Sequence, residues 1–174
     1  ISFSFTDPSL SRASDFKIIS NSFVNEGKIP LDFVSNDCGG NNSQPHLSWS
    51  GAPADTGYFA IIMDDPDAQS IAGYTWVHLN IYNIPANISS IPEGEKINDG
   101  RYRKNHNKKK AYTGPCAPKG THKYIFSIYA LSKEIPSKYF GNYGAGSRPH
   151  NHEKFENLFG DIIIGKSEYV GFWR

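Results

Sequence analysis

The sequence lacks the features that define several protein classes. Its longest purely apolar stretches, such as 59–63 and 162–164, fall far short of the roughly 20 residues that a membrane-spanning helix needs. Only 2 cysteines are present, too few for a disulfide-dense scaffold. The net charge is +1, so no overall field attracts nucleic acid or an anionic membrane. With 38% hydrophobic and 14% aromatic residues, the chain is too apolar to be disordered, which predicts one soluble globular domain spanning 1–174.

The two cysteines leave the redox state and the compartment open. Cys38 and Cys116 can form one intramolecular disulfide, which closes a loop of about 80 residues and stabilises the fold by about 4 kcal/mol in the chain-entropy model. Two free thiols in a reducing compartment fit the sequence equally well. Because no signal segment is recognisable after Ile1, both a cytoplasmic and an exported or periplasmic location stay open.

Short β-branched or aromatic runs, each closed by turn residues, recur along the chain and predict antiparallel strands. They cover 29–34, 58–63, 76–83, 122–131 and 169–173. Helical spacing occurs in 151–164, where the apolar residues are Phe155, Leu158, Phe159, Ile162 and Ile163. The pattern predicts an all-β fold with short helices, in which two antiparallel sheets form a β-sandwich and a helix comes late in the chain.

A basic run occupies 101–110, where six of ten residues are Lys or Arg. It has no apolar face to bury, so we expect a solvated loop; the alternative is an electrostatic lip that attracts anions or a phosphorylated partner. Direct reading of nucleic acid is not expected, because acids elsewhere compensate the charge and no stacking platform is evident.

Asp65 ends an apolar strand and begins a turn. Alternation along the strand places it on the same face as Phe59, Ile61 and Met63, so a carboxylate is predicted at the rim of a core-facing row. Because Pro66 suits a type I turn, the simpler interpretation is that this carboxylate caps backbone amides.

The next strand carries two different rows of side chains. One row has aromatic bodies and polar tips, which suit the lining of a cavity: Trp76, His78, Asn80 and Tyr82. The opposite row is aliphatic and is predicted to be core: Val77, Leu79 and Ile81. The alternative for His78 is a buried histidine satisfied by a backbone carbonyl.

Residues 112–124 form a third segment. Gly114 and Pro115 predict a stiff loop whose few amides can face a ligand, and the strand that follows carries His122 and Tyr124 on one face. Stiff turns at strand ends are common, so this segment by itself carries little functional information.

Together, these segments resemble the phosphatidylethanolamine-binding protein family, also called Raf kinase inhibitor-like, and most of all its bacterial branch. The resemblance covers about 32–174. The motifs that carry it are Cys38-Gly39-Gly40, Gln44-Pro45-His46-Leu47-Ser48-Trp49, Asp65-Pro66-Asp67-Ala68-Gln69, Trp76-Val77-His78, Gly114-Pro115-Cys116-Ala117-Pro118 and His122-Lys123-Tyr124. The departures from the family pattern surround its polar centre: Gly39, Gln44, His46, Gln69 and Ala117.

The resemblance implies a two-sheet sandwich with an anion pocket at one end. Its ligand-binding residues would be Asp65, His78, Gly114, Pro115, His122 and Tyr124, with Trp76 and Asp67 in support. The implied ligand is a phosphate-bearing small molecule or a phospholipid headgroup, with no cofactor. The implied role is that of a regulatory or inhibitory module whose protein partner is a kinase or a protease.

Charge constrains this pocket. Asp65 repels a phosphate unless a positive or proton-donating group intervenes, and His78 and His122 can supply one. We therefore expect anion binding to strengthen as the pH falls through the range in which histidine titrates.

A hydrolase is the main alternative function. Asp65, His78 and either Cys116 or a serine could form a catalytic group. However, no Gly-x-Ser-x-Gly motif is present, and Pro115 indicates a rigid loop rather than an activated thiol at Cys116. We therefore expect a binding protein and no enzyme.

A metal site is not expected either. The tightest histidine pair, His150-x-His152, has no third ligand and no cysteine nearby, which makes it a poor zinc pattern. Both side chains are expected to be exposed at the entrance of a helix.

Overall fold

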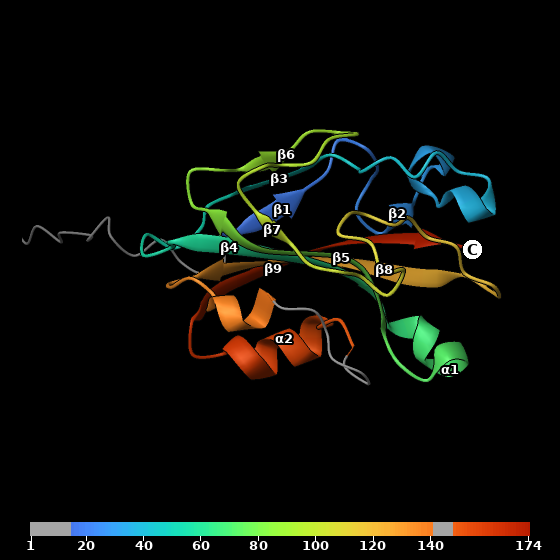
Figure 1. Cartoon of the computed structure of the whole chain (residues 1–174). Helices are drawn as coiled ribbons and strands as arrows, with labels where there is room; N and C mark the ends of the chain where they lie inside the picture. Colours follow the sequence, from blue (N-terminus) through green and yellow to red (C-terminus); the bar gives the residue numbers. More distant parts are fainter. Residues whose placement is uncertain (1–14, 141–147) are drawn as a thin grey trace, which may run out of the picture.

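The computed structural model describes residues 15–140 and 148–174 (Figure 1). Within these residues, a larger sheet has six strands in the order β2-β9-β8-β4-β5-β7, and a smaller sheet has three in the order β1-β3-β6. The larger sheet contains β2 Gly27–Lys28, β4 Tyr58–Asp65, β5 Trp76–Pro85, β7 Arg101–Tyr102, β8 His122–Leu131 and β9 Ile163–Trp173. The smaller contains β1 Lys17–Ile19, β3 Leu47–Ser50 and β6 Ser90–Ile91. Neighbouring strands pair antiparallel, while the two-residue strand β2 runs parallel to β9.

The larger sheet is covered on both faces, so the protein has two cores. The smaller sheet lies on one face, and α2 (His152–Phe159) lies on the other (Figure 1). On β4, Phe59, Ile61 and Met63 point into the core between the sheets, whereas Ala60 and Ile62 pack into the core beneath α2. Burial of both faces explains why this strand is apolar almost throughout. The predicted two-sheet β fold with a late helix is confirmed.

The remaining elements are short helical turns. They are η2 Leu31–Phe33, η3 Asn36–Cys38, η4 Pro66–Ala68 and η5 Ser137–Phe140, which are 3-10 helices, and the four-residue α1 Gln69–Ala72. The helix α1 directly follows η4 at one end of the larger sheet (Figure 1).

The strand predicted at 29–34 is wrong. Only β2 pairs with β9 in this region, and the chain then turns at Pro30 into η2. The amide of Phe33 donates to the Pro30 carbonyl, and the amide of Val34 donates to the Leu31 carbonyl. Local 3-10 hydrogen bonds therefore pair the backbone amides of this segment, although its β-branched and aromatic composition is typical of a strand.

The helix predicted over 151–164 is shorter than expected. It ends at Phe159, and the amide of Ile162 then closes a turn onto the Phe159 carbonyl. Ile163 already belongs to β9, which pairs with β8 along its length, from Leu131 to His122. Pairing with a long central strand outweighs the helical spacing of Ile162 and Ile163, and the last strand is correspondingly longer than predicted.

The expectation of a solvated basic loop at 101–110 is wrong for its first half. Arg101 and Tyr102 form β7 against β5, and Arg103 and Asn105 are buried. The Asn105 amide group holds the loop in place, since it donates to the carbonyls of His78 (2.9 Å) and Ala111 (3.0 Å). The lysines at 108–110 are exposed, as predicted.

Among the described residues, the search for a helix long and apolar enough to cross a membrane finds none.

Candidate functional site

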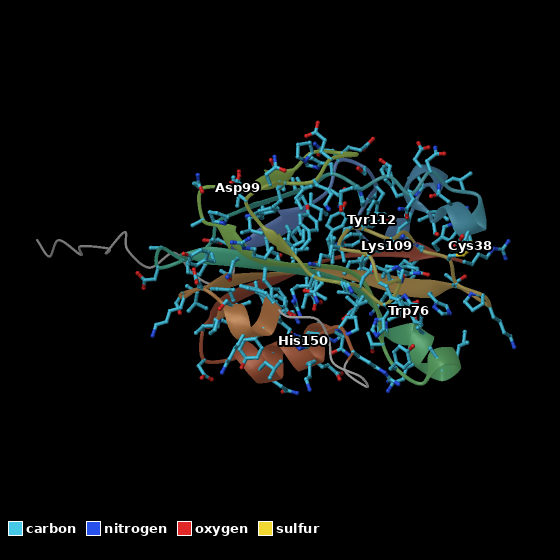
Figure 2. The ribbon with its side chains drawn as sticks, in the orientation of Figure 1. Cys38, Trp76, Asp99, Lys109, Tyr112 and His150 are labelled. Atoms are coloured by element: carbon cyan, nitrogen blue, oxygen red, sulfur yellow. A yellow bond between two sulfur atoms is a disulfide. The ribbon has the colours of Figure 1, made fainter. Side chains whose placement is uncertain are left out.

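A cavity of about 340 Å³ opens at the end of the larger sheet next to α1. Its polar lining comes from the end of β4, the start of β5, the start of β8 and the loop before β8. The lining residues that the sequence singled out are Asp65, Trp76, His78, Gly114, His122 and Tyr124. Figure 2 shows Trp76 at this end of the sheet, near α1. The structure thus brings together side chains from three separated segments of the chain.

Two of the predicted residues support the cavity without lining it. A carboxylate oxygen of Asp67 accepts a hydrogen bond from the Lys123 amide (2.7 Å), which ties η4 to β8. The carbonyl of Pro115 accepts one from the Ser35 amide (3.0 Å), which ties the loop before β8 to the segment before η3.

A β-bulge at His78 shapes the wall that β5 contributes. Asp64 is opposite Val77, and Met63 is opposite Leu79, so His78 is an extra residue on β5. Both His78 and Leu79 therefore lie on the inner face, His78 against the cavity and Leu79 in the core between the sheets. Such bulges redirect the side chains beyond them.

The bulge overturns two predictions from simple alternation. Asn80 and Tyr82 do not continue the cavity row; they lie on the α2 face, where their side chains bond to the carbonyl (3.4 Å) and ring Nδ1 (2.6 Å) of His150. Val77, predicted to share a core with Leu79, lies on the α2 face as well.

Asp65 and His122 form a buried pair. Nδ1 of His122 lies 2.6 Å from Oδ2 of Asp65, and both side chains are 5% exposed. The other carboxylate oxygen, Oδ1, accepts from the Ala68 amide (3.1 Å), so the predicted capping of the turn is present too. Burial raises the pKa of Asp65, and the contact with His122 opposes that rise.

The hydrogen bonds of His122 locate a shared proton. Its Nε2 lies 3.1 Å from the Lys119 carbonyl, which can only accept, so Nε2 carries a proton. A second proton lies between Nδ1 and the Asp65 carboxylate. The total charge of the pair is zero whichever atom holds this proton. A neutral acid beside a neutral imidazole and a carboxylate beside an imidazolium have the same total charge.

His78 is neutral. Its Nδ1–H donates to the Thr113 carbonyl (2.8 Å), and burial lowers the pKa of the imidazole to about 4. The alternative of a histidine satisfied by a backbone carbonyl is therefore the one that the structure supports, and the expectation that His78 supplies a positive charge near neutral pH is wrong. Its Nε2 is left as a hydrogen-bond acceptor.

Tyr124 carries an unused hydroxyl. The side chain is fully buried, yet its OH has no hydrogen-bond partner among the described residues. Burial is the main cause that raises the pKa of this phenol, with Asp65 and Asp67 adding to it, so the hydroxyl keeps its proton. A buried polar group without a partner costs free energy, and this one lies in the wall of the cavity.

The loop before β8 fits tightly against the segment around η3. A Cβ on Gly114 would lie 2.2 Å from the Phe33 carbonyl oxygen, so only glycine fits there. Its amide donates to Oδ1 of Asn42 (2.7 Å) and is not free for a ligand, contrary to the expectation for an amide near Gly114. Cys116 forms a disulfide with Cys38, which is one of the two states that the sequence left open.

Sequence reasoning missed several lining residues. Ile71 and Ala72 of α1 contribute an apolar side, and Ile71 is half exposed. Asn107 of the basic run also lines the cavity and accepts from the Trp76 indole N–H (3.1 Å). Asp37 directly precedes Cys38 in η3, lines the cavity and is exposed. Asn107 and the two residues of α1 carry no motif that points to the cavity.

The histidine pair at the start of α2 bonds to side chains of the larger sheet. Nδ1 of His150 bonds with the Tyr82 hydroxyl (2.6 Å), and Nδ1 of His152 bonds with Oδ2 of the buried Asp64 (2.6 Å). Both histidines are partly buried, whereas the sequence predicted exposed side chains. In the described ranges, no group of three or more His, Cys, Asp or Glu residues is arranged to hold a metal ion.

The fold and the site define a two-sheet β protein with a cavity at one sheet end, lined by a buried Asp–His pair, a second histidine and a tyrosine. The sequence pattern of the phosphatidylethanolamine-binding protein family matches residues 19–171. This chain therefore belongs to that family and groups with its bacterial members.

Similar proteins occur in archaea and bacteria. A UPF0098 protein of Methanothermobacter thermautotrophicus is 37% identical over 88% of this chain and 95% of its own length. The Escherichia coli protein YbhB is also 37% identical, over 68% of this chain and 79% of its own. The crystal structure of E. coli YbcL, described as a member of the mammalian PEBP family, has a TM-score of 0.77 at 25% identity and covers 92% of this chain and 98% of its own.

Proposed function

We propose that the cavity beside α1 binds the phosphate group of a small molecule or of a phospholipid headgroup. The observation that carries this proposal is the Tyr124 hydroxyl, a buried donor that has no partner among the described residues and belongs to a residue that lines the cavity. A phosphate oxygen is an acceptor that would satisfy it. The family's name and fold support the same class of ligand.

Two acids, Asp37 and Asp65, line the cavity, and the buried one is compensated by His122. No Lys or Arg is among the described residues that line the cavity, so neutral donors have to bind the ligand. The Asp65–His122 pair carries no net charge while it holds its proton, which removes the repulsion that a lone carboxylate would exert. The exposed Asp37 at the same cavity suits the ammonium group of a zwitterionic headgroup.

Calorimetric titration with phosphate and with phosphoethanolamine at pH 5.5 tests the proposal and separates the two sources of the phosphate. We expect the Tyr124→Phe variant, which keeps the ring and loses only the donor, to bind either ligand about tenfold more weakly, since a hydrogen bond to a charged group contributes about 1.5 kcal/mol or more. The matched control is Tyr58→Phe, at the far end of β4. Equal affinity of wild type and Tyr124→Phe would refute the phosphate site.

We further propose that the protein acts by binding rather than by catalysis, as a regulatory or inhibitory module for a kinase or a protease. Cys116, the candidate nucleophile, is bonded to Cys38, and the Ser35 hydroxyl at the cavity accepts from the Asp37 amide. Neither is poised for attack on a substrate. Hydrolysis of a phosphoester or an ester that disappears in His78→Ala would contradict this proposal.

A further inference from the structure

A second cavity, of about 540 Å³, lies on the α2 side of the larger sheet, and the proposed function does not use it. The residues that matter in its lining are Tyr74, His106, Tyr139, Arg148 and Lys154. Among the described residues that line it, none is acidic. Figure 2 shows His150, another of its residues, beside α2 and apart from Trp76. Two cations and two phenol rings thus border one hollow.

His106 offers this cavity a defined hydrogen-bond donor. The Val77 amide donates to Nδ1 of His106 (2.7 Å), so Nε2 carries the ring proton. Nε2 is buried and has no hydrogen-bond partner within the described part of the chain. Burial, together with the charge of Arg148, lowers the pKa of His106 to about 4, so the ring is a neutral donor near neutral pH. An acceptor that reaches Nε2 would remove the cost of an unpaired buried group.

Arg148 provides a movable cation at the same place. Its guanidinium lies 3.7 Å from the centre of the Tyr74 ring, and the side chain is exposed. The ion pairs of the described residues do not include it. A planar guanidinium without a carboxylate partner matches the two oxygens of a ligand carboxylate.

Aromatic rings form the wall behind this cation. Tyr74 stacks on Trp76 with 5.8 Å between ring centres and 13° between planes, and His106 lies 4.9 Å from Tyr74. The wall is built of aromatic rings, which favours a flat aromatic group over a flexible chain.

From these contacts we propose that the second cavity is a binding site for a small aromatic carboxylate. The ring of the ligand packs against Tyr139 and takes the place of the Arg148 guanidinium on the Tyr74 ring. Its carboxylate accepts hydrogen bonds from Arg148, Lys154 and Nε2 of His106. The site is separate from the first cavity, because the Trp76 ring lies between them: it lines the first, stacks on Tyr74 and contacts His106 of the second.

Benzoate is the probe that tests this site. In a titration of the full chain followed by amide NMR at pH 7, we expect benzoate to shift the signals of Tyr74, Thr75 and Asn151. We also expect the Nε2 proton of His106 to become observable as the ligand shields it from exchange. Acetate, which lacks the ring, and benzyl alcohol, which lacks the charge, should each bind at least about tenfold more weakly.

Arginine variants provide the matched comparison. Arg148→Gln should weaken benzoate binding about tenfold, because it removes a charge-assisted pair, whereas Arg101→Gln, with the same change of charge on β7, should leave the affinity unchanged. Lys154→Gln serves as the second variant if Arg148→Gln alters the folded state. Tyr124→Phe should not affect benzoate, so failure of the phosphate site and failure of this site can be told apart.

Three results would overturn the proposal. One is that benzoate shifts only residues of the first cavity. Another is equal weakening by Arg148→Gln and Arg101→Gln, which would indicate general charge attraction. The third is that acetate binds as tightly as benzoate, because the aromatic wall would then contribute nothing.

Discussion

At the scale of single residues, the protonation of one pair sets the charge of the phosphate cavity. Asp65 and His122 share a proton that leaves them without net charge. When the pH rises and this proton is lost, the pair keeps the negative charge of the carboxylate. An anion in the cavity is then repelled, so its affinity has to fall as the pH rises.

This dependence predicts the behaviour of Asp65→Asn. Burial raises the pKa of Asp65, so we expect wild type to bind dimethyl phosphate, whose single charge does not titrate between pH 5.5 and 8, more weakly at the higher pH, by up to about tenfold. In the variant, residue 65 cannot become negatively charged as the pH rises. Its affinity for dimethyl phosphate at pH 8 should therefore exceed that of wild type, and its affinities at the two pH values should be similar. Calorimetry at both pH values measures the effect.

Asp37→Asn is the control, since it removes a carboxylate of the same cavity that has no histidine partner among the described residues. We expect it to strengthen anion binding equally at both pH values. If Asp65→Asn keeps the pH dependence of wild type, a group other than the Asp65–His122 pair is responsible.

Single residues also show what the sequence could and could not predict about the site. Alternation correctly put Asp65 on the face of Phe59, Ile61 and Met63 and put Tyr124 on one face with His122, because β4 and β8 have no extra residue there, whereas their place at a pocket came from the family resemblance. The protonation of His78 could not be predicted, since it depends on complete burial and on the Thr113 carbonyl, which is 35 residues away in the sequence. The interpretation as a carbonyl-bonded histidine was available from the residue type alone.

At the scale of elements, ionic contacts join α2 to the larger sheet, and one of them lies at the first residue of the helix. Oδ2 of Asp64 accepts from both the amide (2.8 Å) and Nδ1 (2.6 Å) of His152, the first residue of the helix. The hydrogen bond to Asp64 is the largest cause that raises the pKa of His152, while burial and Lys166 oppose it and Glu153 adds to it.

The raised pKa predicts how the contact changes with pH. A histidine whose pKa is higher in the folded than in the unfolded state contributes stability at pH values below its unfolded pKa, and this contribution is lost as the pH rises through the folded value. We therefore expect His152→Gln to lower the free energy of unfolding more at pH 5.5 than at pH 8.5. Urea unfolding at the two pH values measures the difference.

Asp64→Asn should reduce the same pH dependence, because it removes the charge that holds the proton. A destabilisation by His152→Gln that is equal at both pH values would mean that the imidazole contributes by packing alone. The backbone amide of residue 152 can still donate to Asp64 in the glutamine variant, so the comparison isolates the ring.

Elements differ in how well the sequence predicted them. The strands β4, β5 and β8 lie in the middle of the larger sheet and have long β-branched and aromatic runs, and all three were predicted nearly to their ends. The wrong predictions concern residues whose secondary structure depends on pairing with a strand that is distant in the sequence. Ile163 pairs with Leu131 instead of extending α2, and the extra residue at His78 is visible only in its register with β4.

At the scale of the whole molecule, one covalent bond connects the two segments that border the phosphate cavity. Cys38 ends η3, and Cys116 lies in the cavity wall, 78 residues further along the chain. Figure 2 shows Cys38 at the same end of the molecule as Trp76. The disulfide can therefore affect both stability and ligand binding. It restricts the conformations of the unfolded chain, and it fixes the part of the cavity wall that Gly114 and Cys116 form.

These two effects can be separated by replacing both cysteines with serine. We expect the double variant to lose about 4 kcal/mol of stability, as the entropy of a loop of this length predicts, which chemical unfolding measures. We also expect it to bind phosphate more weakly at a temperature where it is fully folded, because the loop before β8 is then held only by weaker contacts such as the bond from the Gly114 amide to Asn42. Wild type treated with a reductant should behave in the same way. If stability falls but the phosphate affinity of the folded variant equals that of wild type, the disulfide acts on the unfolded chain alone and the cavity wall is held by its hydrogen bonds and packing.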